Sequence, residues 1–178
     1  MSSDRQEKNT DFQVGGSLHL AVAEAQRMHS ERASSKDILM VLARAGDAVG
    51  GEDSAASILV LDSQGALRNG ASPRLPADYL AAIDGLIPDP EVGTCAAAAA
   101  TGVVVITEDF LSDDKWSELR HLPLALGYVG AWSMPITTAD GRILGTFGTY
   151  FRSKRSPSDE EISAVRKLAQ TAAEVLNA

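Results

Sequence analysis

The chain has 178 residues, a length that favours a single domain with one sizeable hydrophobic core. Its formal net charge of −8 argues against nucleic acid or an anionic membrane as the main partner. No apolar run approaches the roughly 20 residues of a membrane span, and the single cysteine, Cys95, excludes an intrachain disulfide and a multi-cysteine metal site. The polar start of the chain has no signal-peptide pattern, so we expect a cytoplasmic protein.

The beginning of the chain is polar and then becomes periodic. Residues 1–16 end in a pair of glycines and predict a disordered N-terminal tail before a single domain over residues 17–178. An apolar stripe at helical spacing then predicts a first helix from Ser17 to about Met28.

Serine caps and β-rich runs predict the elements that follow. Ser34 or Ser35, with Asp37 in the first helical turn, predicts the start of a second helix. Two β-rich runs separated by a turn predict a first pair of strands, Ala55–Leu61 and Ala66–Ala71. The next predicted elements are a short helix over Ala77–Ile83, a helix over the alanine run behind Thr94, a strand over Val103–Thr107 and a helix over Ser117–Leu126.

The stretch Gly127–Phe151 is predicted to form the central hairpin of the sheet. Asp140-Gly141 separates its two β-rich halves and is a typical hairpin turn. Neither half has a clean polar face, which indicates that both faces of the sheet are covered. Ser156-Pro157, followed by acidic residues, predicts a last helix whose apolar stripe runs to Leu176. This order of elements favours an α+β fold, with terminal helices on one face of an antiparallel sheet and short helices and loops on the other.

The order and spacing of several motifs resemble those of a GAF domain from about Ser17 to Leu176. They include Gly93-Thr94-Cys95 before a helix of small residues, Val103–Asp109, Trp132–Ile136 and Gly141–Phe147. The resemblance implies the GAF fold, with about six strands and a ligand pocket between the sheet and the middle helices. It also implies a regulatory sensor of the kind common in bacterial signalling and two-component systems. Because no output domain follows within the 178 residues, we expect it to act on a partner such as a sensor kinase in trans.

The family contains several chemistries, which match this chain unequally. Free methionine-(R)-sulfoxide reductases have this fold and use several cysteines, of which only the position of Cys95 is matched here. Covalent bilin attachment would need a cysteine where Glu118 stands, and the signature of cyclic-nucleotide-binding GAF domains is absent. No nucleophile–base pair is found, so we expect no enzyme. We also expect no cofactor and no metal site. A reductase, a haem or redox sensor that uses Cys95 or His121, and a pure interaction module stay open as alternatives.

The helix start behind Thr94 is the predicted ligand site. The free backbone N–H groups of Cys95, Ala96 and Ala97 can bind an anion without a basic side chain. GAF proteins that bind nitrate are part of the family, and the resemblance therefore implies a small anion such as nitrate as a candidate ligand. The alternative is that water, a neighbouring loop or the Thr94 side chain satisfies these groups.

Three further side chains belong to the predicted site. Trp132, on the central strand, is expected to form a wall of the pocket, and Trp116 to cover its mouth. The thiol of Cys95, close to a helix N-terminus, is expected to have a lowered pKa if it is a redox sensor. The alternative for Trp132 and Cys95 is that they pack in the hydrophobic core without a ligand, and for Trp116 that it anchors its own loop.

The first and last helices each carry an apolar stripe, Leu18–Met28 and Ile162–Leu176. The last helix can cover the sheet with one side and still leave apolar residues for another surface. A two-fold bundle of these helices would bury both stripes, so the sequence predicts a homodimer.

Overall fold

The computed structural model describes the backbone of residues 3–178 and the side chains from residue 15 onwards. The first two residues of the predicted tail lie outside the described part. Along the chain the elements are α1 (Ser3–Ser30), α2 (Ser35–Gly50), β1 (Ser54–Leu61), β2 (Leu67–Ala71), α3 (Ala77–Ile83), α4 (Cys95–Thr101), β3 (Val105–Thr107), the 3-10 helix η1 (Asp114–Trp116), α5 (His121–Ala125), β4 (Gly130–Thr137), β5 (Ile143–Phe151) and α6 (Asp159–Leu176).

The described strands form one antiparallel sheet of five strands, where about six were expected. Their order is β2-β1-β5-β4-β3, so the predicted hairpin of β4 and β5 lies at the centre. It pairs from Gly130 with Phe151 to Thr137 with Ile143. Gly141 in the connecting turn has a φ of 87°, a conformation that glycine adopts without steric cost.

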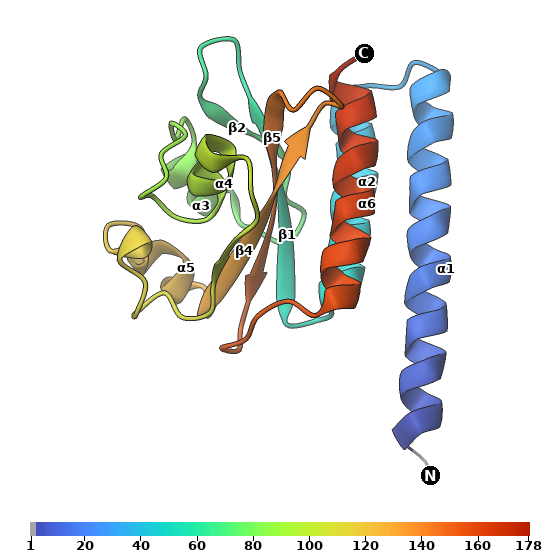
Figure 1. Ribbon diagram of the computed structural model, residues 1–178, viewed down its shortest axis with the longest axis horizontal. Helices are drawn as coiled ribbons and strands as arrows, with labels where there is room; N and C mark the ends of the chain where they lie inside the picture. Colours follow the sequence, from blue (N-terminus) through green and yellow to red (C-terminus); the bar gives the residue numbers. More distant parts are fainter. Residues whose placement is uncertain (1–2) are drawn as a thin grey trace.

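Helices cover both faces of this sheet, as the sequence predicted (Figure 1). α3, α4 and α5 lie on one face, whereas α2 and α6 lie on the other and α1 packs outside them. Two large groups of buried side chains follow from this layering. The α2/α6 face buries Ile38, Leu42, Trp132, Phe147 and Leu168, among others. The opposite face buries the aromatic residues Tyr79, Phe110, Trp116, Tyr128 and Tyr150.

The helix caps explain where the two long helices of the covering layer begin. The Ser34 hydroxyl accepts a hydrogen bond from the N–H of Asp37 at the start of α2, and the Ser158 hydroxyl accepts one from Glu161 at the start of α6. Each bond satisfies an N–H group that has no partner within its own helix. α2 therefore starts at one of the two serines that were expected to cap it, whereas α6 starts two residues later than the expected Ser156-Pro157, because Ser158 and not Ser156 is its cap.

Two predictions about helices differ from the structure. α1 begins at Ser3, so residues 3–16 continue the helix where a disordered tail was expected. Once the turns that pack on α2 and α6 have formed, each further residue adds a hydrogen bond at little cost, even through two glycines. The helix expected over Ser117–Leu126 is reduced to the short α5, and residues 117–120 before it form turns. A continuous helix there would hold Pro123 in its interior, where proline removes a bond and clashes with the preceding turn.

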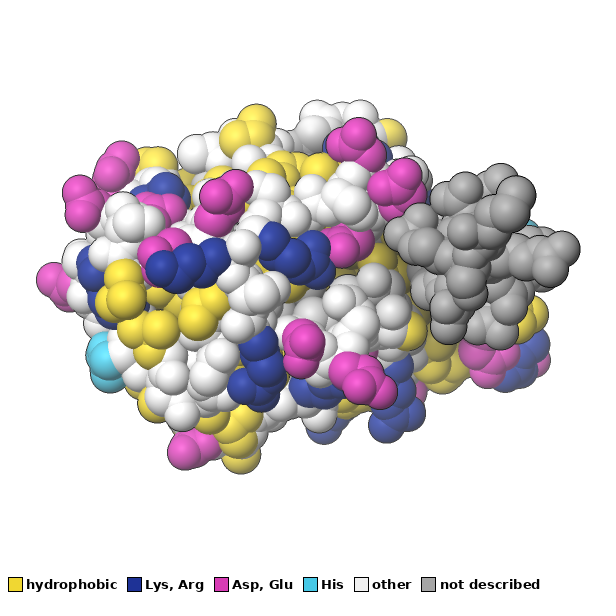
Figure 2. All heavy atoms as spheres, turned by 90° about the horizontal axis from the view of Figure 1, so that it is seen from below, with side chains coloured by type: hydrophobic (Ala, Val, Ile, Leu, Met, Phe, Trp, Pro, Cys, Tyr) yellow, Lys and Arg dark blue, Asp and Glu magenta, His cyan; other side chains and the backbone are white. Residues whose placement is uncertain are grey.

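On the face shown in Figure 2, acidic and basic side chains are interspersed. None of the helices in the described part of the chain combines the length and the apolarity that a membrane crossing requires.

Candidate functional site

α4 approaches the central strands closely because β5 has a glycine beneath it. A Cβ atom at Gly148 would lie 2.9 Å from the Sγ of Cys95 and 3.3 Å from the Oγ of Ser133. The absence of a side chain thus makes room for the first turn of α4 on the sheet. This contact positions the residues of the predicted site.

Three buried polar side chains meet at this contact. The Ser133 hydroxyl donates to the Oγ1 of Thr94 over 2.9 Å and lies 3.0 Å from the Sγ of Cys95. Thr94 stands directly before α4 but makes no side-chain capping bond to it. Thr94 thus holds the expected N-cap position, but the alternative that its side chain satisfies the free N–H groups of α4 is wrong, because its hydroxyl is turned to the sheet.

A small cavity of about 20 Å³ lies beside this cluster, between the sheet and the covering elements. This space is enough for about one water molecule. Four of the predicted site residues line it, Thr94, Cys95, Ala96 and Trp116, together with the phenols of Tyr79 and Tyr150.

The lining of the cavity offers hydrogen-bond donors but no charge. The Nε1 of Trp116 is buried and has no hydrogen-bond partner among the described residues. The Tyr79 hydroxyl donates to the Tyr150 hydroxyl over 2.7 Å, which leaves the proton of Tyr150 available for another acceptor. Burial raises the pKa of both phenols, so they stay protonated at neutral pH.

Cys95 does not have the lowered pKa that a thiolate sensor requires. Burial raises the pKa of its thiol, and the surrounding hydroxyl groups, that of Ser133 first, only partly oppose this effect. The expectation of a thiolate stabilised at the helix start is therefore wrong in direction. α4 spans only Cys95–Thr101, and loss of hydration outweighs what so short a helix can supply.

Trp132 and Ala97 lie away from the cavity. Trp132 packs in the core between the sheet and the α2/α6 layer, because side chains alternate along β4 and its neighbour Ser133 faces α4. It is therefore no wall of this cavity, which corrects the prediction. Ala97 is buried in α4 but is not part of the lining.

The alternative haem ligand is also placed elsewhere. His121 is exposed at the start of α5 and does not line the cavity. Among the residues from 15 onwards, no group of three His, Cys, Asp or Glu side chains has an arrangement that could hold a metal ion.

Sequence reasoning missed the two tyrosines of the site. A signal for Tyr150 was present: it stands two residues after Gly148 on β5 and therefore faces the same side of the sheet. Tyr79 had no such signal, since its partner lies 71 positions away in the chain. Only the fold brings these two phenols together.

Comparisons with known proteins agree with this architecture. The family model described as GAF domain matches residues 33–177. Over 117 residues the chain is 34% identical to the methyl sulfide methyltransferase-associated sensor of Methanosarcina acetivorans, an alignment that covers 65% of this chain and only 12% of that protein.

Solved structures show the same fold at low sequence identity. The GAF domain of a phosphoenolpyruvate-protein phosphotransferase from Acinetobacter is 16% identical, with a TM-score of 0.71 and 91% of each chain covered. A domain of a protein described as a two-component sensor histidine kinase from Sinorhizobium meliloti 1021 is 23% identical, with a TM-score of 0.65, over 79% of this chain and 89% of that one. From its sheet, its covering helices and the match over residues 33–177, the chain belongs to the GAF domain family and is related to GAF domains of sensor proteins.

Proposed function

We propose that this chain is a regulatory sensor module that binds a small ligand in the cavity beneath α4 and acts on a signalling partner, such as a sensor kinase, in trans. The observation that carries the proposal is that Trp116, whose Nε1 is a buried donor without a partner among the described residues, lines this cavity, whereas Trp132, whose Nε1 is also unpaired, does not. Native interiors rarely leave such a donor unpaired. A ligand that accepts a hydrogen bond there removes the cost of the unpaired group and gains affinity from it.

The lining defines the chemistry of the ligand. Trp116 and Tyr150 each supply one donor, whereas no lysine or arginine belongs to the lining. A small molecule rich in acceptor oxygen atoms fits this pattern, and nitrate and nitrite are the first probes to use. Because only hydrogen bonds offset the dehydration of an anion here, the affinity is modest, roughly micromolar to millimolar.

A ligand larger than water requires the cavity to open, and this requirement supplies a signal. The covering elements are short: α3 has 7 residues and η1 has 3. Such elements open at lower free energy than the central strands on the other side. Binding thus moves α3 or η1 outward and changes the surface that a partner meets.

A catalytic role is less well supported than sensing. A reductase of the methionine sulfoxide type needs a second thiol to resolve its intermediate, and Cys95 is the only cysteine in the chain. Burial also raises the pKa of that thiol, which disfavours the nucleophilic thiolate.

Calorimetry with paired tryptophan variants tests the proposal. The probes are nitrate, nitrite, halides and small neutral molecules that carry oxygen acceptors. Trp116→Phe keeps an aromatic ring but removes the N–H donor, and should weaken binding of a nitrate-type probe by about ten- to a hundredfold. Trp132→Phe is the matched control, since it makes the same change on the other face of the sheet and should leave binding intact.

Two results would contradict the proposal. The first is that none of the probes gives heat with the wild-type protein. The second is that Trp116→Phe and Trp132→Phe weaken binding equally, which would place the ligand away from the cavity.

A further inference from the structure

The helix layer on the α2/α6 face stops short of the last strand of the sheet. α2 packs on β1 and β2, whereas α6 packs on β4 and β5, and β3 forms the edge beyond them. A groove with a volume of about 380 Å³ runs along the uncovered side of α6. It is open to solvent and separate from the cavity beneath α4.

The floor and rim of this groove are mainly apolar. Met134 and Pro135 from β4 and Val104 beside β3 line it. Val103, at its rim, is 58% exposed, and Ile106 on β3 is 39% exposed. Water thus contacts a strip of large apolar side chains along the edge of the sheet, which is typical of an interaction surface.

The wall formed by α6 is shaped for another helix. Arg166, Ala169 and Gln170 line the groove at positions i, i+3 and i+4, which lie on one face of a helix. Ala169 is only 4% exposed, so the exposed side chains on this face are those of Arg166 and Gln170. Side chains one turn apart form ridges that pack against a neighbouring helix. A groove that is open to solvent suits a helix better than a small molecule, which needs a site that encloses most of its surface.

The only charged side chain of the lining is positive. Arg166 has no ion pair with any of the described residues, although the chain as a whole carries a net charge of −8. A carboxylate placed opposite Arg166 would therefore meet the one cation of the groove without competition. Such complementarity favours an acidic partner and disfavours a basic one.

We propose that this groove binds an acidic amphipathic helix of a partner protein. The apolar face of that helix packs over Met134, Val103 and Val104, and its glutamate or aspartate side chains pair with Arg166. Gln170, one turn further along α6, offers an amide for a second polar contact. This proposal concerns a different surface from the ligand cavity and does not depend on ligand binding.

Synthetic peptides and a charge exchange test this inference. The probe is a fluorescently labelled amphipathic peptide of about four helical turns, with a leucine face flanked by glutamates, and its matched peptide has lysines in place of the glutamates. We expect the glutamate peptide to bind the wild-type protein more tightly in an anisotropy titration. Arg166→Glu should weaken binding of the glutamate peptide about tenfold. The same variant should bind the lysine peptide more tightly than the wild-type protein does.

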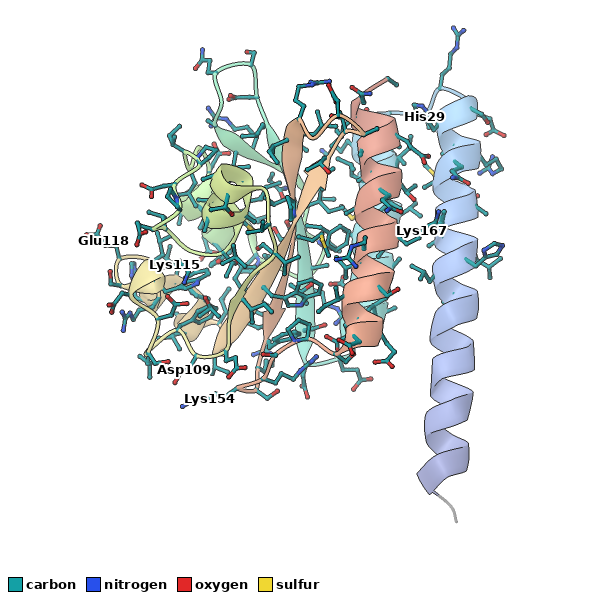
Figure 3. The ribbon with its side chains drawn as sticks, in the orientation of Figure 1. His29, Asp109, Lys115, Glu118, Lys154 and Lys167 are labelled. Atoms are coloured by element: carbon teal, nitrogen blue, oxygen red, sulfur yellow. The ribbon has the colours of Figure 1, made fainter. Side chains whose placement is uncertain are left out.

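Lys167→Glu is the control, because it makes the same change of charge one residue further along α6. In Figure 3 Lys167 lies on the side of α6 that faces α1, and the contact of Gln26 with Glu174 marks this side as well. This variant should bind the glutamate peptide like the wild type.

Three outcomes would overturn the proposal. In the first, the glutamate peptide does not bind or binds no better than the lysine peptide. In the second, Lys167→Glu weakens binding as much as Arg166→Glu. In the third, light scattering shows a wild-type dimer that Arg166→Glu dissociates, which would make a second copy of the chain the occupant of the groove.

Discussion

Cys95 is held as a thiol by its surroundings. It is the first residue of α4 and is only 8% exposed, and burial raises the pKa of its thiol. Alkylation by iodoacetamide, followed by mass spectrometry, should therefore be much slower in the folded protein than in urea at the same neutral pH. Folded protein that reacts as fast as the unfolded chain would restore the redox-sensor alternative.

Asp47 completes the hydrogen bonding of β1. Its Oδ1 accepts the N–H of Ala56 over 2.7 Å, at a point where β2 does not yet pair with β1. Asp47→Ala leaves this N–H without an acceptor and should lower the free energy of unfolding by about 1–3 kcal/mol. Asp47→Asn keeps an acceptor and should cost less. Urea unfolding curves measure both changes, and equal losses in the two variants would contradict this role.

The same carboxyl group predicts a pH dependence. Burial raises the pKa of Asp47, so the folded state binds a proton more tightly than the unfolded state does. As pH falls through the raised pKa towards the ordinary value of an aspartate, the wild type should gain stability relative to Asp47→Asn. If the stability of the wild type relative to Asp47→Asn stays constant or falls over this acidic range, the pKa of Asp47 in the folded state is not raised.

At the scale of elements, the contact of α4 with β5 depends on a missing side chain. Gly148→Ala would place a Cβ atom 2.9 Å from the Sγ of Cys95, so α4 must shift outward. We expect a loss of about 1–3 kcal/mol in the free energy of unfolding.

A glycine of α1 supplies the control for this change in β5. Gly16 lies in α1 with nothing within 4 Å of the Cβ position, so Gly16→Ala should be neutral or stabilising. Losses of equal size in Gly16→Ala and Gly148→Ala would mean that the close approach of α4 does not matter.

Local patterns predicted most elements, because their signals are contained in a few neighbouring residues. The helix over Ala77–Ile83 has the expected bounds, and Ser34 caps α2 as one of the two serines expected there. The last helix begins slightly later than expected, because Ser158 and not Ser156 caps it. The pair of Tyr79 and Tyr150 could not be predicted in this way, since it depends on how α3 lies against β5. The assignment of Trp132 to the pocket failed for a different reason. Strand alternation predicts that Trp132 and Ser133 point to opposite faces of the sheet. It does not predict which of the two faces α4 covers.

At the scale of the whole molecule, α1 is the surface that we expect to form a dimer. The apolar stripe of α6 is already covered by the sheet and α1, whereas Leu20 on α1 is 70% exposed. The helix also extends beyond the rest of the molecule (Figure 1). We expect a dimer by light scattering at micromolar concentration, and Leu20→Glu should shift it to the monomer. A wild-type monomer under these conditions would contradict the dimer.

A small ligand is expected to bind beside Trp116, and the indole N–H signals of the two tryptophans test this binding most directly. The chain has two tryptophans, which lie on opposite faces of the sheet, so each spectrum contains its own control. In a proton–nitrogen correlation NMR titration with nitrate, nitrite or neutral oxygen-bearing molecules, the Trp116 signal should shift saturably while that of Trp132 stays in place. Movement of Trp132 alone, or no movement of Trp116 with any of these probes, would contradict the account.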